Sequence, residues 1–410
     1  MKIYISGISG TAMGPLALMA KNAGFTVCGS DKNEGAVTKE LRAEGVIFEI
    51  GEQDGAFLKK QHEAEKIDWF VYTSALPKDH PELALARELG IKVSKRDEFI
   101  AFLIEKLGFK MVAVAGTHGK TTTTSIIIWA CLKLGLPASW LVGTTLGFAE
   151  AGKYVPGTKY LIYEADEYDR NFLYYHPWLS AITTVSYDHP DIYPTREAYV
   201  EAFSQFEKQS EIVIKDCEMH AGIVLAGEAR RYDANLASNV VKKMAEDAGM
   251  VIDENLLIRV INEFPGVGRR FERIADGIYS DYAHHPEEIV ATINVAKEEA
   301  NMRGLKGVVA VYEPHQNSRQ HEVKDGYKNS FLGAKKLFWL PTYLTRENPE
   351  LPVLTPKDFI DILSNKEIAE EAEMDEEMLS KLQHLRDEGY LVLLMTAGPA
   401  GKKYREFFSC

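Results

Sequence analysis

The sequence predicts an α/β protein with mainly parallel sheets. β-prone apolar runs alternate with helix-like runs along most of the chain, and glycine-rich turns follow several of these runs. The chain has 410 residues, enough for two or three domains, and 46% of them are hydrophobic, which suffices for a core in each. Breaks in the alternation predict three domains, at residues 1–108, 109–264 and 265–410.

The first domain shows this alternation from its first residues. Its expected strands and helices are, in chain order, Lys2–Ile5, Pro15–Ala23, Thr26–Gly29, Val37–Glu44 and Asp68–Thr73. Strands separated by helices pair in parallel, because each helix returns the chain to the edge of the sheet where the previous strand began.

The same alternation continues through the second and third domains. The second has expected strands at Met111–Ala115, Tyr160–Glu164 and Ala181–Val185, and helices at Ala198–Gln209 and Val240–Ala248. The third has expected strands at Gly277–Asp281, Gly307–Tyr312, Lys336–Leu340 and Tyr390–Met395, and a helix at Pro286–Ala300. The acidic run Glu367–Glu377 predicts a solvated helix face.

Composition excludes several classes of protein. A formal net charge of −13 argues against a general binder of nucleic acid or of membrane surfaces. The four cysteines have no C-x-x-C spacing and no histidine cluster beside them, so neither a zinc site nor a disulfide framework is expected. The sequence starts on a strand-like run without a signal peptide, and no apolar stretch is long enough to span a bilayer. We therefore expect a cytoplasmic protein without membrane insertion.

The second domain opens with a sequence typical of a phosphate-binding loop. A strand-like run leads into a glycine-rich turn and then into a helix. The standard pattern is G-x-x-x-x-G-K-[ST]; Gly119, Lys120 and Thr121 fit its end, whereas Val114 stands at its first glycine. Backbone N–H groups at Gly116 and the helix dipole suit phosphate. Lys120 can reach the β- and γ-phosphates of ATP, and Thr121 can bind magnesium.

Two polar segments follow the next strands of this domain. Glu164–Asp169 (EADEYD) follows one strand, and a carboxylate at this end of a parallel strand is suited to magnesium. Asp188–Asp191 (DHPD) follows the next, and His189 within it is a candidate metal ligand or proton donor. Taken alone, each segment could equally be an ordinary solvated loop.

The first domain carries a weaker nucleotide signal. Gly7–Gly14 reads G-x-x-G-x-x-x-G instead of G-x-G-x-x-G, and it opens a predicted helix. Gly29–Asp31 closes the second strand, where an acidic residue commonly meets a ribose hydroxyl. A nucleotide-bearing ligand other than ATP is therefore expected in this domain.

Polar segments also follow two strands of the third domain. Asp281–Pro286 (DYAHHP) carries two adjacent histidines, whose side chains point to opposite sides if the chain is extended, so at most one is expected in a site. Glu313–Arg319 (EPHQNSR) carries a histidine and an arginine that can clamp a substrate carboxylate. The arginine pair that ends Gly268–Arg270 precedes both segments.

In this order the motifs resemble those of the Mur ligase family over nearly the whole chain. The shared set is Gly116–Thr122, Glu164–Asp169, Asp188–Asp191, Gly266–Phe271 and Asp281–Pro286. Further motifs resemble the branch of the family that adds L-alanine to UDP-N-acetylmuramate, namely Gly7–Gly14, Gly29–Asp31, Thr73–Ala75 and Glu313–Arg319.

This resemblance implies an ATP-dependent carboxylate–amine ligase that acts through an acyl-phosphate in peptidoglycan precursor synthesis. A Rossmann-like first domain would hold UDP-N-acetylmuramate, a P-loop ATPase middle domain would hold ATP and Mg²⁺, and a Rossmann-like third domain would bring a small amino acid. The enzyme would act as a monomer or homodimer.

The resemblance also implies roles for individual residues. Residues in catalysis would be Lys120, His189, Arg270 and His284. ATP would be bound by Gly116, Thr117, His118, Gly119, Lys120, Thr121, Thr122, Asn239, Arg270 and Asp281. Magnesium would be held by Thr121, Glu164 and His189. The substrates would be bound by Gly7, Ser9, Gly10, Thr11, Ala12, Met13, Asp31, Ser74, His315 and Arg319.

Several positions depart from the family pattern. Gln316 stands where an arginine often follows the histidine, and Thr184 replaces an asparagine. Ser204 stands where other branches carry a carbamylated lysine, which agrees with the L-alanine branch. Two alternatives stay open. One is a ligase that recycles a whole tripeptide onto UDP-N-acetylmuramate, although Arg319 favours a single amino acid as the substrate. The other is a P-loop nucleotide-binding module without ligase activity.

Overall fold

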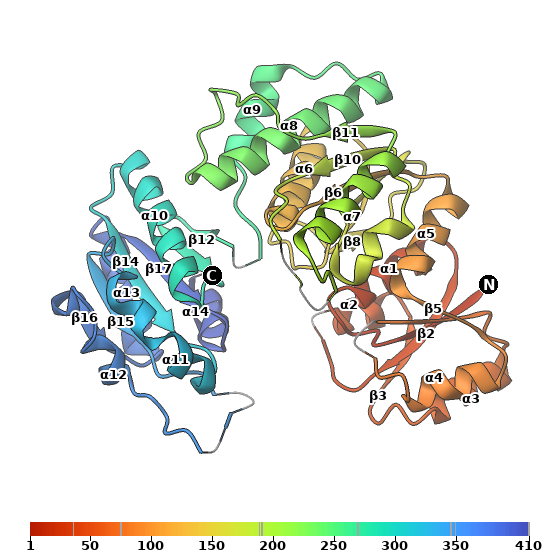
Figure 1. Cartoon of the computed structure of the whole chain (residues 1–410), viewed down its shortest axis with the longest axis horizontal. Helices are drawn as coiled ribbons and strands as arrows, with labels where there is room; N and C mark the ends of the chain where they lie inside the picture. Colours follow the sequence, from red (N-terminus) through yellow and green to blue (C-terminus); the bar gives the residue numbers. More distant parts are fainter. Residues whose placement is uncertain are drawn as a thin grey trace. The chain divides into compact units, whose positions relative to one another are not determined.

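The computed structural model describes residues 1–35, 37–73, 76–187, 189, 192–268, 270–344, 347–348 and 350–408. In these residues three sheets, mostly parallel, alternate with helices, which confirms the predicted α/β class (Figure 1). The described chain divides into two compact units, residues 1–223 with 232–264, and residues 224–231 with 265–410. No helix among the described residues is both long and apolar enough to cross a membrane.

The first sheet is wholly parallel, in the order β3-β2-β1-β4-β5. Its strands are β1 (Lys2–Ser6), β2 (Thr26–Asp31), β3 (Ile47–Ile50), β4 (Trp69–Tyr72) and β5 (Lys92–Lys95). Its helices are α1 (Met13–Asn22), α2 (Thr38–Ala43), α3 (Ala56–Ala64), α4 (Pro81–Glu88) and α5 (Arg96–Leu107). The strand order reverses between β1 and β4, the place where such sheets bind ligands, and the Gly7–Gly14 loop starts there.

The second sheet has the order β11-β10-β6-β9-β7-β8, and only β8 runs antiparallel to its neighbour within the described residues. Its strands are β6 (Lys110–Ala115), β7 (Ser139–Leu141), β8 (Gly152–Lys153), β9 (Tyr160–Glu164), β10 (Leu179–Ile182) and β11 (Ile212–Ile214). The accompanying helices are α6 (Lys120–Leu134), η1 (Tyr168–Tyr174), α7 (Arg196–Gln209), α8 (Glu228–Ala248) and α9 (Glu254–Asn262).

The first two sheets share one continuous hydrophobic core. Ile3 of β1, Leu103 of α5 and Leu161 of β9 belong to the same buried cluster. Gly108, the predicted domain boundary, ends α5 in the left-handed conformation at φ 67°. The shared core explains why both sheets fall in one compact unit.

The third sheet has the order β12-β13-β17-β14-β15-β16. Its strands are β12 (Glu272–Ala275), β13 (Ile278–Asp281), β14 (Val308–Glu313), β15 (Lys336–Trp339), β16 (Ala369–Glu371) and β17 (Leu391–Thr396). The helices are α10 (Pro286–Met302), α11 (Asn317–Val323), η2 (Lys324–Asn329), α12 (Pro356–Ile360), η3 (Lys366–Ile368), α13 (Glu376–Asp387) and α14 (Ala400–Phe408). Leu393 of β17 faces the core under α10, whereas Leu394 faces the core under α13 and α14, so helices cover both faces (Figure 1).

Two predicted elements were wrong in part. The acidic run Glu367–Glu377 is not a helix face: it contains the edge strand β16, and α13 begins only at Glu376. An edge strand tolerates charged side chains because solvent reaches one of its sides. The third strand of the second domain was expected to run to Val185, yet β10 ends at Ile182, because the threonines that follow bond the phosphate loop instead.

Candidate active site

The loop between β6 and α6 has a backbone that only glycine permits at two positions. Gly116 has φ 141° and Gly119 has φ 87°. A Cβ at Gly116 would collide with the hydroxyl of Thr183, and one at Gly119 would collide with the carboxylate of Asp233. The chain therefore passes close to its neighbours here, and the loop keeps the turned backbone that suits phosphate binding.

The residues after β10 hold the loop in place. The backbone N–H of Thr117 donates to the carbonyl oxygen of Thr184 at 2.6 Å, and the Thr183 hydroxyl donates to the His118 carbonyl at 2.5 Å. The Thr117 hydroxyl accepts from the backbone N–H of Ser186 at 2.9 Å, while the His118 side chain stays exposed. Thr184, which stands where the family often has an asparagine, thus serves the loop through its backbone carbonyl and through its hydroxyl, which accepts from the backbone N–H of His118 at 3.2 Å.

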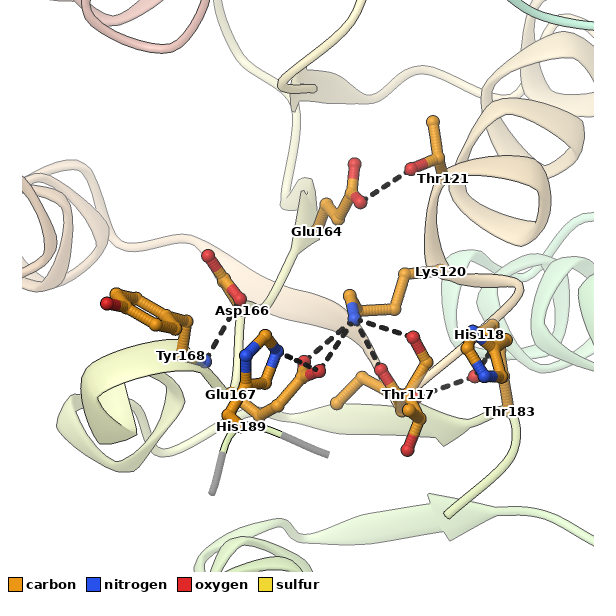
Figure 2. Close-up of polar contacts among 12 residues, drawn as sticks. Thr117, His118, Lys120, Thr121, Glu164, Asp166, Glu167, Tyr168, Thr183 and His189 are labelled. Atoms are coloured by element: carbon orange, nitrogen blue, oxygen red, sulfur yellow. Dashed lines mark hydrogen bonds and ion pairs between the residues drawn. The ribbon is translucent and has the colours of Figure 1, made fainter. Parts of the chain in front are cut away.

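The Lys120 ammonium is surrounded by acceptors of its own chain (Figure 2). Its Nζ donates to the carbonyl oxygens of Gly116 at 2.5 Å and Thr117 at 3.2 Å. It also lies 3.0 and 2.8 Å from the two carboxylate oxygens of Glu167. Sequence reasoning placed Glu167 inside the acidic segment but gave it no role. Its signal was its spacing, three residues after Glu164.

Thr121 and Glu164, both expected from the sequence to bind magnesium, lie beside each other. The Thr121 hydroxyl, at the start of α6, donates to Oε1 of Glu164, at the end of β9, at 2.7 Å (Figure 2). A hydroxyl and a carboxylate are the hard oxygen ligands that Mg²⁺ prefers, so this pair fits the ion. Among the described residues, no group of three or more His, Cys, Asp or Glu side chains forms a ready-made metal site.

His189 lies beside Glu167. Its backbone has φ 55°, and its Nε2 is 3.7 Å from Oε1 of Glu167. Its ring meets the ring of Tyr168 edge to face, with centroids 5.2 Å apart. A non-glycine residue in the left-handed region is uncommon and often marks a functional position. The flanking Asp188 and Asp191 lie outside the described residues.

The predicted adenine contact lies on α8. The Asn239 side-chain amide donates to the carbonyl oxygen of Asn235 at 2.8 Å. Asn235 itself is structural, because its side chain accepts from the backbone N–H of His220 and donates to the carbonyl of Glu218. α8 also begins twelve residues earlier than Val240, at Glu228.

The predicted UDP loop lies at the carboxyl edge of the first sheet. The Ser9 backbone N–H donates to the Asp31 carboxylate at 2.8 Å, so Asp31 braces the loop. The Ser9 hydroxyl is buried and has no hydrogen-bond partner among the described residues. Gly10 and Thr11 lead to Ala12, the N-cap of α1, and Met13 is buried in that helix. Ser74 lies outside the described residues.

In the second unit, the Asp281 carboxylate accepts hydrogen bonds from the backbone around it. The donors are the backbone N–H groups of Phe271 at 2.7 Å and Ala283 at 2.8 Å. Burial raises the pKa of Asp281, while these hydrogen bonds oppose the rise. Arg270 is exposed. A ribose contact by Asp281 would therefore be made by a carboxylate that the fold already fixes.

His284, His315, Tyr343 and Arg319 form a cluster elsewhere in this unit. The rings of His284 and His315 lie 6.3 Å apart, and those of His315 and Tyr343 lie 5.6 Å apart. Burial, followed by the charge of Arg319 and then by His284, lowers the pKa of His315. His285 is instead the N-cap of α10, as expected from the opposite orientation of adjacent side chains.

The chain is similar in sequence to known proteins along most of its length. Residues 2–106 match the family model described as "Mur ligase family, catalytic domain", and residues 114–232 match "Mur ligase middle domain", together more than half of the chain. The UDP-N-acetylmuramate–L-alanine ligase of Rubrobacter xylanophilus is 31% identical over 88% of this chain and 89% of its own. That of Caldicellulosiruptor saccharolyticus is 29% identical over 98% of this chain and 97% of its own.

Solved structures share the fold. The UDP-N-acetylmuramate–alanine ligase of Thermotoga maritima superposes with a TM-score of 0.74 at 22% identity, covering 99% of this chain and 98% of that one. A murein peptide ligase of Psychrobacter arcticus has a TM-score of 0.56 at 21% identity, covering 100% and 99%. At these identities both likenesses speak for the fold alone.

Proposed function

The chain belongs to the Mur ligase family, and from this we propose that it joins L-alanine to UDP-N-acetylmuramate with conversion of ATP to ADP and phosphate. The observation that carries the proposal is the phosphate loop, in which Lys120 and Thr121 face two carboxylates of the segment after β9. Relatives that bear this activity in their names match the chain over most of its length.

The reaction has two steps. First, a carboxylate oxygen of the muramate attacks the γ-phosphorus of ATP, the bond to the bridging oxygen breaks, and ADP leaves. The neutral amine of alanine then attacks the acyl carbon, phosphate leaves, and the nitrogen loses a proton. Lys120 neutralises charge on the phosphates during the first step.

The metal requirement follows from the oxygen donors of the loop. Thr121 and Glu164, with His189 as a further candidate, would hold Mg²⁺. The ion would supply positive charge beside the phosphates. Asn239, Arg270 and Asp281 would contribute the remaining contacts to the nucleotide.

The substrates divide among the three sheets in this proposal. Residues 1–108 would bind the UDP part through the Gly7–Gly14 loop, whose buried Ser9 hydroxyl has no protein partner among the described residues. Residues 109–264 would bind ATP. Residues 265–410 would bind alanine, with Arg319 pairing its carboxylate and His284 and His315 beside it.

A phosphate-release assay tests the proposal and its alternatives. Release should require ATP, Mg²⁺, UDP-N-acetylmuramate and L-alanine together, with weaker activity on glycine and L-serine. Faster release with L-Ala-γ-D-Glu-meso-diaminopimelate than with L-alanine would instead identify a recycling ligase. This comparison matters because Gln316 stands where the family often has an arginine, so the choice of amino acid is open. ATP binding without any amine-dependent release would leave only a nucleotide-binding module.

A further inference from the structure

Glu167 is the most deeply buried carboxylate beside the phosphate loop. Its side chain is 1% exposed, and that of Lys120 is 15% exposed. Removing a carboxylate from water is costly unless a cation compensates it. In the described part of the chain, the Lys120 ammonium and the imidazole of His189 lie beside Glu167.

The Lys120 ammonium has no hydrogen left for a further acceptor in this arrangement. An ammonium has three N–H donors, and four oxygens of the protein surround this one, two of them from Glu167. The carbonyls of Gly116 and Thr117 account for the others, and Figure 2 shows Thr117 beside Lys120. A phosphate oxygen can bond Lys120 only by replacing one of these acceptors.

Glu167 is the acceptor that such an exchange would replace. Gly116 and Thr117 belong to the loop itself, and Thr117 is fixed there by hydrogen bonds to the backbone carbonyls of Thr184 and Ser186. The two oxygens of Glu167, by contrast, carry a negative charge toward the same ammonium, as two phosphate oxygens would.

We infer that Glu167 is a positioning residue of the phosphate loop, whose carboxylate holds the Lys120 ammonium in place of phosphate until a nucleotide displaces it. Thr121 and Glu164 form a similar pair. Glu164, three residues before Glu167 in the same segment, accepts a hydrogen bond from the Thr121 hydroxyl. The inference rests on the proposed function only in requiring that this loop binds nucleotide phosphates.

Two consequences follow for binding. Lys120 loses its side-chain freedom before the nucleotide arrives, so its ammonium is already in the loop. The carboxylate also competes with the phosphates, so nucleotide binding is weaker than the loop alone would allow. Glu167 therefore favours both release of the nucleotide product and a fixed position of the Lys120 ammonium in the loop.

The test measures ADP binding to the full chain by calorimetry in EDTA, so that no metal takes part. Glu167→Gln keeps the shape and removes the charge, and it should lower the Kd for ADP by roughly tenfold, the effect of losing one competing charge-assisted contact. Asp169→Asn is the matched control. It removes the same charge from the same segment, but Asp169 pairs with Lys95, and its Kd should stay at the wild-type value.

A double-variant cycle shows whether Glu167 acts through Lys120. In a Lys120→Ala background, Glu167→Gln should leave the Kd for ADP almost unchanged. An unchanged or higher Kd for Glu167→Gln alone, with normal binding by the wild type, overturns the inference and leaves the proposed function standing. No ADP binding by the wild type would instead overturn the proposed role of the loop.

Folding is checked by thermal unfolding of each variant. If Glu167→Gln does not fold, Glu167→Met, which has a similar volume and no charge, carries the same test. Loss of folding in both variants would make the carboxylate a requirement of the fold and would overturn its assignment as a positioning residue.

Discussion

The residues proposed to bind the nucleotide, around Lys120 and Thr121 (the nucleotide cluster), differ from those proposed to bind the amino acid, around His315 and Arg319 (the amino-acid cluster), in how far their polar groups are already paired. In the first unit, Lys120 and Thr121 are bonded to carboxylates of their own chain. In the second, Nδ1 of His315 is buried without a hydrogen-bond partner, and Arg319 makes no hydrogen bond or ion pair among the described residues. On the proposed function, a nucleotide would therefore have to displace existing contacts, whereas the amino acid would add new ones. Substitutions should consequently affect stability and binding together in the first cluster, and mainly binding in the second.

The largest effect is expected for Lys120→Ala. Turnover should fall by about 10³-fold or more, because the charge that develops on the phosphates loses its main neutralising group. The protein should stay folded but lose about 3 kcal/mol of unfolding free energy, since Glu167 is left buried without its ammonium. Phosphate release and urea unfolding measure the two effects.

A control for Lys120→Ala is Lys95→Ala. Its ion pair with Asp169 is about one-third exposed on both sides, so its loss should cost under about 1 kcal/mol. Equal stability losses in the two variants would contradict the claim that burial of Glu167 makes its ion pair with Lys120 more important for stability than an exposed pair.

Arg319→Ala should act mainly on binding, with little effect on stability at neutral pH. Loss of a charge-assisted pair with the carboxylate of the amino acid should raise the KM for L-alanine by the equivalent of about 2–5 kcal/mol. The KM for ATP should change little, and the unfolding free energy should stay within about 0.5 kcal/mol of the wild type, because Arg319 makes no polar pair that folding needs. A parallel rise in both KM values would remove Arg319 from the role of carboxylate clamp.

Gly116→Ala should disturb the nucleotide cluster through the backbone. At φ 141° an alanine is strained, and its Cβ would press on Thr183, so we expect a loss of about 2 kcal/mol in stability and weaker ADP binding. Gly157→Ala is the comparison variant. Gly157 also has a positive φ, 79°, but a Cβ there meets nothing within 4 Å. If Gly157→Ala weakened ADP binding as much, general strain and not the loop would be responsible.

The sequence predicted the fold class and singled out Thr121 and Glu164 as candidate magnesium ligands, because both inferences depend on local patterns. A glycine-rich turn between strand and helix fixes where Thr121 lies, and the end of a parallel strand fixes Glu164. Glu167 escaped assignment because its role depends on a side chain 47 residues away, which no periodicity encodes. For the same reason, the alternation of strands and helices, which predicted two separate domains here, could not predict that the first two sheets share one core.

The smallest effect should come from the titration of His315. Burial, Arg319 and His284 lower its pKa, so the folded protein binds a proton there less readily than the unfolded chain. The resulting stability is fully present above the unfolded pKa of about 6.5 and is lost as the pH falls through the folded value. The melting temperature of His315→Asn should therefore fall less steeply than that of the wild type as the pH is lowered from 7.5 to 5. Arg319→Ala should also reduce the slope, because its charge is one of the causes. Equal slopes in all three proteins would mean that this cluster imposes no electrostatic cost on a protonated histidine. The charges of the amino-acid cluster would then be as well balanced by opposite charges as those of the nucleotide cluster.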